Sequence, residues 1–373
     1  MQFNSLEAKI RQRIIFLSLV NIIFYVFHIP FNNAGIWIAI IQYMLIFHRI
    51  RIADYKFLIY LYFNTIFYIS ENIAHCQWFA LVSTLPFLLK TRQVNVGFLN
   101  FSVKKNISKA PLKYNNLEDM TRYTRPIIKP IASTREGFEY LLKASLLTAL
   151  RDGITLLEMS IDCWFIDRYN GNPDVFINKL KEIHALVAPT LDFRPVIGLN
   201  RDLNIKKLEV WALPLIESGY FKSIDLYGTE DAEKPEVYRK IYIRAKEERM
   251  KLKAHIGEFS DAKSIQKTVK ILNLDEVQHG ISAVQSEAVM NWLKKNNIRV
   301  NICPTSNIKL GRVKNIETHP IKILFDHGIK VTINSDDILA FNQTVSMEYL
   351  NLYRSGLFSA EELNTIRLEG LKN

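Results

Sequence analysis

The feature that most constrains the fold is an alternation of short apolar runs and longer amphipathic stretches, which begins near residue 105. Between the runs lie stretches with apolar residues at helical spacing, such as residues 237–249 and 286–297. Strands that are apolar on both faces and alternate with helices are typical of a parallel sheet covered by helices. The seven runs are residues 154–160, 195–199, 222–228, 251–257, 276–280, 298–303 and 329–334.

Seven strands are one short of a closed α/β barrel. We therefore expect an α/β fold, a (β/α)8 TIM barrel, with its eighth strand upstream of residue 154. We expect this barrel to occupy residues 93–373 and to follow a highly apolar extension at residues 1–92. The sequence ends at GLKN, inside what reads as the last helix, and this indicates a shortened C-terminus.

Side chains that bind metals or move protons gather at the carboxyl ends of these runs. His255 and Glu258 end one run, His279 ends the next, and Asp336 and Asp337 follow the last. The strand ends of an α/β barrel converge on one face, so these side chains should meet there. A divalent cation would neutralise the repulsion between the adjacent acids, and zinc suits imidazole with carboxylate ligands. The pattern favours a barrel of the metal-dependent hydrolase type.

Four short motifs in this order resemble the adenosine deaminase family of the amidohydrolase superfamily. The motifs are HIGE at 255–258, HG at 279–280, CPTSN at 303–307 and SDD at 335–337. The spacing of 24 residues between the two histidines is similar to that family too, as is the acidic pair after HPIKILFDHGIKVTIN. The resemblance runs from about residue 135 to the C-terminus.

The resemblance implies a zinc-dependent hydrolytic deaminase that converts adenosine or a related aminopurine, with water, to the oxopurine and ammonia. It implies that His255 and Asp336 bind Zn²⁺ and that Asp336 also contacts the attacking water. Glu258 would protonate the purine N1, and His279 would hold the water. The implied catalytic residues are thus Glu258, His279 and Asp336.

The resemblance also implies two substrate contacts. Gly228 would let the purine approach the backbone closely, and Asp337 would hydrogen-bond the purine N7. For the pair Asp336–Asp337, an ordinary helix N-cap with its neighbour remains an alternative, because Asp favours that position before a helix. A purine nucleoside or free base is the expected partner, since no motif supplies a phosphate site.

The chain departs from the family at the first strand, where an HxH pair supplies two further zinc ligands. No HxH occurs in this sequence, although His75 and Gln77 stand at that spacing in AHCQWFA. We take His75 as the third metal candidate, while the Gln77 amide is a poor zinc ligand. Residues 93–101 are a second candidate for the first strand and bring no ligand. The alternative therefore stays open that this is a catalytically degenerate deaminase-like module, which binds a purine or serves in assembly.

Residues 14–89 allow two interpretations. They form four apolar blocks, and Lys and Arg flank alternate connections, as four membrane spans with both ends in the cytoplasm would show. The middle two blocks, 35–47 and 57–69, are nevertheless short for a bilayer span of about 17–25 residues. The other interpretation is a set of soluble buried helices together with the first barrel strand. His75 cannot lie both on a barrel strand and inside a span.

Charge and cysteine usage exclude other classes. The formal net charge is +11, but no long basic run is present, so we expect no nucleic-acid partner. Three cysteines without a CxxC motif fit a reducing compartment, and we expect Cys303 to pack in the core. We expect a cytoplasmic protein, anchored to a membrane with a cytoplasmic catalytic domain if residues 14–89 span the bilayer.

Overall fold

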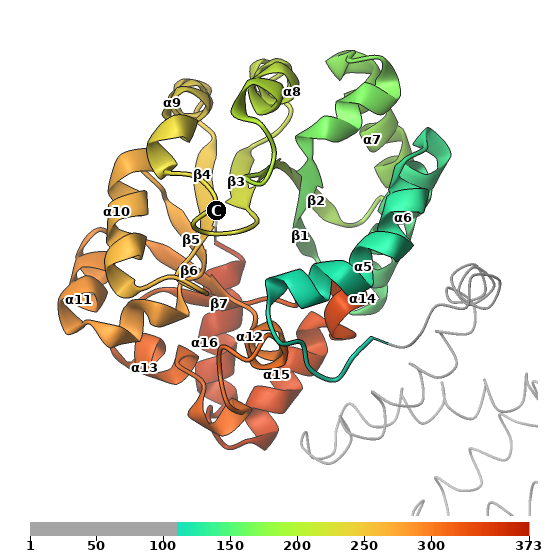
Figure 1. Ribbon diagram of the computed structural model, residues 1–373. Helices are drawn as coiled ribbons and strands as arrows, with labels where there is room; N and C mark the ends of the chain where they lie inside the picture. The colour runs from blue at the N-terminus through green and yellow to red at the C-terminus, as the bar shows by residue number, and fades with distance from the viewer. Residues whose placement is uncertain (1–109, 373) are drawn as a thin grey trace, which may run out of the picture. The chain divides into compact units, whose positions relative to one another are not determined.

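The structure is a computed structural model that describes residues 110–372, and its centre is a curled parallel sheet (Figure 1). Within these residues the sheet has seven strands in the order of the chain, and each pairs in parallel with the next. All seven predicted strands are thereby confirmed. The strands are β1 (Leu156–Asp162), β2 (Asp192–Asn200), β3 (Ser223–Tyr227), β4 (Lys251–Ile256), β5 (Glu276–His279), β6 (Arg299–Ile302) and β7 (Val331–Ile333).

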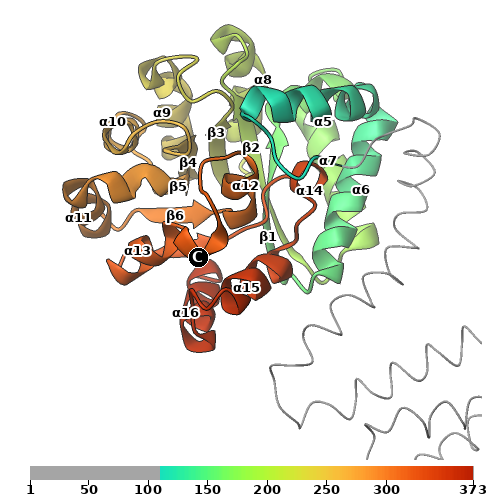
Figure 2. The same ribbon diagram turned by 60° about the horizontal axis from the view of Figure 1, so that its bottom comes forward.

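Helices follow the strands and lie around the outside of the sheet (Figures 1 and 2). The helices after β1 to β4 are α7 (Pro173–Val187), α8 (Ile205–Glu217), α9 (Arg239–Glu247) and α10 (Ala262–Leu272), with the 3-10 turns η2 (Cys163–Tyr169) and η3 (Pro235–Tyr238). Those after β5 and β6 are α11 (Glu287–Lys295), α12 (Pro304–Lys309) and α13 (Ile321–Asp326), with η4 (Ile281–Gln285) and η5 (Ile316–Thr318). Those after β7 are α14 (Ile338–Phe341), α15 (Val345–Arg354) and α16 (Ala360–Gly370).

Sheet and helices share one apolar core. Strand residues such as Ile197 and Val300 are fully buried, as are Leu208 and Leu215 on the inner side of α8. Burying each such side chain stabilises the fold by about 1.5–3 kcal/mol relative to exposure. Polar side chains set the helix starts, as where the Asp261 carboxylate accepts the backbone N–H of Ser264 before α10.

The seven-stranded curled part of the predicted barrel is confirmed, while its eighth strand is not among the described residues and stays a prediction. Among residues 110–372, β1 and β7 are the two edges of the sheet. Upstream of β1, the chain forms α5 (Leu117–Ala132) and α6 (Arg135–Arg151). The buried residues of α6, Phe138, Leu142 and Leu146, recur at four-residue spacing, which suits a helix and not a strand.

The predictions for the N-terminal part lie outside the described residues. These are the apolar extension at residues 1–92, its candidate membrane spans at 14–89, His75, and the first-strand candidate at 93–101. Of the helices within residues 110–372, none has both the length and the apolar character needed to cross a bilayer.

Candidate active site

The side chains predicted to converge lie together at the carboxyl ends of the strands. His255 and His279, from the neighbouring strands β4 and β5, have ring centroids 5.2 Å apart. His279 Nε2 lies 3.8 Å from Asp336 Oδ2, and His279 Nδ1 lies 3.4 Å from Glu258 Oε1. His279 is thus the centre of the cluster, with His255, Glu258 and Asp336 on three sides of it.

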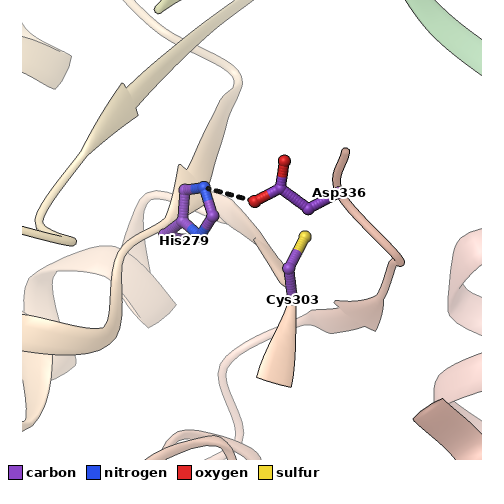
Figure 3. A group of neighbouring side chains, drawn as sticks. All are labelled: His279, Cys303 and Asp336. Carbon is purple, nitrogen blue, oxygen red and sulfur yellow. Dashed lines mark ion pairs between the residues drawn. The ribbon is translucent and has the colours of Figure 1, made fainter. Parts of the chain in front are cut away.

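The backbone is left-handed at two of these residues. The φ angle is 63° at His279 and 59° at Asp336. Few residues other than glycine adopt this region, at a cost of about 1–3 kcal/mol each where the surrounding structure enforces it. Such conformations concentrate at functional sites, and here they direct an imidazole and a carboxylate toward each other across the mouth of the sheet (Figure 3).

Glu258 is a buried acid with one strong partner. Its side chain is 6% exposed, and its Oε1 accepts a hydrogen bond from Asn307 Nδ2 at 2.6 Å. Burial, followed by the Asp336 carboxylate, raises the pKa of Glu258, although His279, His255 and Asn307 oppose the shift. The protonated form that a proton donor needs is therefore favoured relative to an exposed glutamate.

The CPTSN segment holds this cluster in place from α12. Asn307 Nδ2 lies 3.1 Å from His279 Nδ1 as well as bonding Glu258, so one amide joins two side chains of the candidate site. Ser306 Oγ donates to Asp336 Oδ2 at 2.6 Å. Sequence reasoning used this motif as part of the family resemblance and missed these contacts. The available signal was a run of polar residues directly after a buried strand.

Cys303 is buried, as predicted, but it also borders the site. Its Sγ, a ring nitrogen of His279 and a carboxylate oxygen of Asp336 all lie within 4.8 Å of one another (Figure 3). Burial raises the pKa of the Cys303 thiol well above its usual value, and the Asp336 carboxylate adds to the shift. The raised pKa favours the protonated thiol, which is a weaker nucleophile than the thiolate.

The donor set of the described residues fits part of a zinc shell. His255 Nδ1 lies 3.2 Å from the buried Asp225 carboxylate, which leaves Nε2 for a metal. A carboxylate behind the other ring nitrogen is the usual support of a metal-binding histidine. Burial lowers the pKa of His255, but Asp225 outweighs it and the net shift is upward. With Asp336, the site offers imidazole and carboxylate ligands, the types zinc accepts.

Gly228 lies where β3 ends, with φ +104°. A Cβ at this position would lie 2.9 Å from Asn200 Oδ1 and 3.0 Å from Asp202 Oδ2. Both the backbone angle and the lack of space therefore require glycine. Its predicted role in substrate approach stays a prediction.

Asp337 is the N-cap of α14, as the alternative for the acidic pair expected. Its Oδ1 accepts the backbone N–H groups of Leu339 at 3.1 Å and Ala340 at 3.4 Å. Since both capping bonds go to Oδ1, they leave Oδ2 for the purine contact that the resemblance implies.

Comparison with known proteins identifies the family. The model of the adenosine deaminase family matches residues 113–373. The chain belongs to the adenosine deaminase family. This confirms the resemblance drawn from the four motifs.

Similar proteins cover most of the described residues. A Treponema pallidum protein named for adenosine/adenine deaminase activity is 36% identical over 260 residues, which are 69% of this chain and 87% of the relative. The crystal structure of an adenine deaminase from Arthrobacter aurescens matches with a TM-score of 0.61 and 21% identity, over 69% of this chain and 80% of that one. An amidohydrolase from Burkholderia ambifaria with bound Zn matches with a TM-score of 0.56 and 17% identity, over 63% and 67% of the two chains. At these identities the two structures show that this deaminase-family chain shares their fold.

Proposed function

We propose that this chain is a zinc-dependent hydrolase that removes the exocyclic amine of adenosine or a related aminopurine. The observation that supports the proposal is the convergence of His255, Glu258, His279 and Asp336 at one mouth of the sheet, in a chain of the adenosine deaminase family. In the overall reaction, water adds to the purine ring, and ammonia leaves.

His255 and Asp336 would hold the zinc ion, and His75 is the further candidate ligand from outside the described residues. A zinc ion at this place supplies Lewis acidity, which lowers the pKa of a water molecule toward about 7. The zinc carried by the amidohydrolase of the same fold supports the choice of metal.

The described side chains suit the remaining steps. Glu258, whose pKa is raised by burial, donates its proton to the ring nitrogen N1, which makes the adjacent carbon electrophilic. The Asn307 amide lies 3.1 Å from His279 Nδ1, and in the tautomer that accepts this bond the Nε2–H can donate a hydrogen bond to the water. Asp336 accepts a hydrogen bond from the same water, and Asp337 and Gly228 face the purine.

The proposal is tested by measuring two properties of the purified full-length chain. Zinc content per chain is determined first, and deamination is then followed as ammonia release from adenosine, adenine and AMP. We expect zinc and turnover of one of these aminopurines. Stoichiometric zinc with no ammonia from any of them would contradict the enzyme and favour the purine-binding or assembly module.

Substitution of Glu258 tests its role as the acid. The Glu258→Gln variant keeps the size and a hydrogen-bonding end but cannot donate the proton, so we expect turnover to fall by about 10²–10⁴-fold. Zinc content should stay at the wild-type value, because Glu258 is not a proposed ligand. The exposed Glu287→Gln change on α11 is the matched control. Wild-type turnover in Glu258→Gln would remove this residue from the mechanism.

A further inference from the structure

One carboxylate outside the cluster organises the loop that bears Glu258. Glu230, in the segment after β3, accepts hydrogen bonds from the backbone N–H groups of Gly257 at 2.8 Å, Glu258 at 2.8 Å, Phe259 at 3.0 Å and Ser260 at 3.1 Å. Ser260 Oγ also donates to it. A carboxylate has about four lone-pair sites, so this loop uses the full capacity of Glu230.

The loop depends on this carboxylate for its backbone partners. Among the described residues, Glu230 is the acceptor shown for the N–H groups of Glu258, Phe259 and Ser260. Hydrogen bonds to an ionised acceptor are stronger than neutral ones. Burial opposes ionisation of Glu230, but the bonds from Ser260 and the loop backbone outweigh it, and the pKa of Glu230 is lowered.

Glu230 is itself held in place from the other side. Arg201 is 3% exposed, and its Nη1 donates to the backbone carbonyl of Glu230 at 2.9 Å. Its Nη2 donates to the carbonyls of Leu226 at 3.2 Å and His255 at 2.5 Å, at the ends of β3 and β4. The guanidinium therefore links the segment that contains Glu230 to β3 and β4. The Glu230 carboxylate in turn binds the loop at residues 257–260, so the position of this loop depends on the same two strands.

We propose that Glu230 is a positioning residue for Glu258, holding residues 257–260 in the arrangement that directs the Glu258 carboxyl at the purine. The inference rests on the proposed deaminase function. Glu230 lies 28 residues from Glu258 in the sequence. Its effect on the reaction passes through the four backbone N–H groups, and not through the proposed metal ligands or the His279 ring.

The Glu230→Gln variant tests this role. The substitution keeps the size but replaces one acceptor oxygen with an NH₂ group, which faces N–H donors and cannot bond them. Because a displacement of about 1 Å of a reacting group can cost about 10²-fold, we expect kcat to fall by about 10²-fold. KM should change by less than about threefold, since Glu230 touches no substrate group. Zinc content should stay as in the wild type.

Amide hydrogen exchange provides a readout that does not depend on activity. The N–H groups of residues 257–260 are bonded to Glu230, so they should exchange slowly in the full-length wild type and faster in Glu230→Gln. The exposed Glu233→Gln change, three residues away in the same segment, is the control and should alter neither exchange nor kcat. Ser260→Ala removes one of the five bonds and should give the same changes to a smaller extent, which keeps the test available if Glu230→Gln does not fold.

Two outcomes would overturn the inference. An active wild type whose kcat is unchanged in Glu230→Gln and Ser260→Ala would show that the loop needs no such support. If Glu230→Gln lowered both kcat and thermal stability but left exchange at residues 257–260 unchanged, Glu230 would stabilise the fold in general and would not be a positioning residue. A wild type that deaminates no aminopurine, yet shows the exchange effect, would contradict the proposed function and not the contact.

Discussion

Asn307 joins the proposed acid to the proposed water-holding histidine. Its Nδ2 is 2.6 Å from Glu258 Oε1 and 3.1 Å from His279 Nδ1, and all three side chains are buried. Neither partner can turn without losing this bond, so the amide fixes the distance between the proposed acid and the proposed water-holding histidine.

Asn307→Ala should therefore impair turnover more than substrate binding. The change leaves Glu258 and His279 without a shared donor, and we expect kcat to fall about 10- to 10²-fold. It should also lower the free energy of unfolding by about 1–3 kcal/mol, because buried polar groups lose a partner. Steady-state kinetics and urea unfolding measure both effects, with the exposed Asn178→Ala change on α7 as control. An unchanged kcat would show that the bridge is structural only.

At the residue scale, sequence reasoning located the groups that follow strand ends and missed those that support them. His255, Glu258, His279 and Asp336 were predictable because parallel strands bring their carboxyl ends together. The roles of Asn307 and Glu230 were not, since their partners depend on how α12 and the loop after β3 turn. Contacts of this kind follow no repeating pattern in the sequence, so the sequence alone does not predict them.

In the loops between strands and helices, backbone angles and close packing restrict which residues can occupy certain positions. Gly257, between β4 and α10, has φ +80°, and a Cβ there would lie 2.4 Å from Ile265 Cδ1 and 2.9 Å from Ser282 Oγ. The backbone at Gly257 thus packs directly against the inner side of α10. Close packing at this point fixes the direction in which the chain leaves the strand toward Glu258.

Gly257→Ala should destabilise the fold through both strain and overlap. We expect the free energy of unfolding to drop by about 2–4 kcal/mol, the sum of a left-handed backbone penalty and overpacking. Gly171→Ala is a matched control, because Gly171 has φ +70° and a methyl group added there would meet no neighbouring atom within 4 Å. That control should lose only about 1–2 kcal/mol in the same urea titration. Equal losses in the two variants would show that contact with Ile265 is not limiting.

At the element scale, the seven strands could be predicted because short runs rich in apolar residues alternate with stretches at helical spacing. The eighth strand was inferred from the arithmetic of a closed barrel and not from a pattern in the residues next to β1. Those residues, in α5 and α6, carry the spacing of amphipathic helices and start at capping side chains, Asn116 and Thr134. The candidates for the eighth strand lie before residue 110, outside the described residues, so that strand stays a prediction.

In the described residues, the proposed active site lies at the carboxyl ends of the strands, and a buried network of ion pairs lies toward their amino ends. Opposite the proposed active site, Lys253 of β4 and Glu276 of β5 are each 2% exposed and lie 3.2 Å apart. Lys253 also pairs with Glu158 of β1 at 2.7 Å, and Arg299 of β6 pairs with Glu276 at 2.7 Å. This buried network ties β1, β4, β5 and β6 together across the interior.

Acid should weaken the protein through this network. Burial raises the pKa of Glu276, but Lys253 and Arg299 outweigh it and bring the pKa down to about 2. Because the folded pKa lies below the ordinary value of 4.5, the stabilisation is complete above pH 4.5 and is lost as the pH falls toward 2. This lowering of the pKa of Glu276 corresponds to a stabilisation of the folded state by about 3 kcal/mol above pH 4.5.

Glu276→Gln removes the titrating group. We expect this variant to be less stable than the wild type at pH 7 by about 3 kcal/mol, since Lys253 and Arg299 lose a buried partner. The difference should shrink between pH 4.5 and pH 2. Unfolding curves at several pH values measure it, and Glu236→Gln, in an exposed pair with Lys267, is the control with an expected effect under about 1 kcal/mol. A difference that is constant with pH would contradict the assignment.

The left-handed backbone at His279 and Asp336 has a consequence for how such a protein can become more heat-resistant. Glycine at either place would relax the main chain and remove a side chain that the proposed chemistry requires. A selection for thermal endurance alone should therefore accumulate inactive chains altered at these two positions. A selection that also requires turnover should instead yield stabilising substitutions at other positions of the fold.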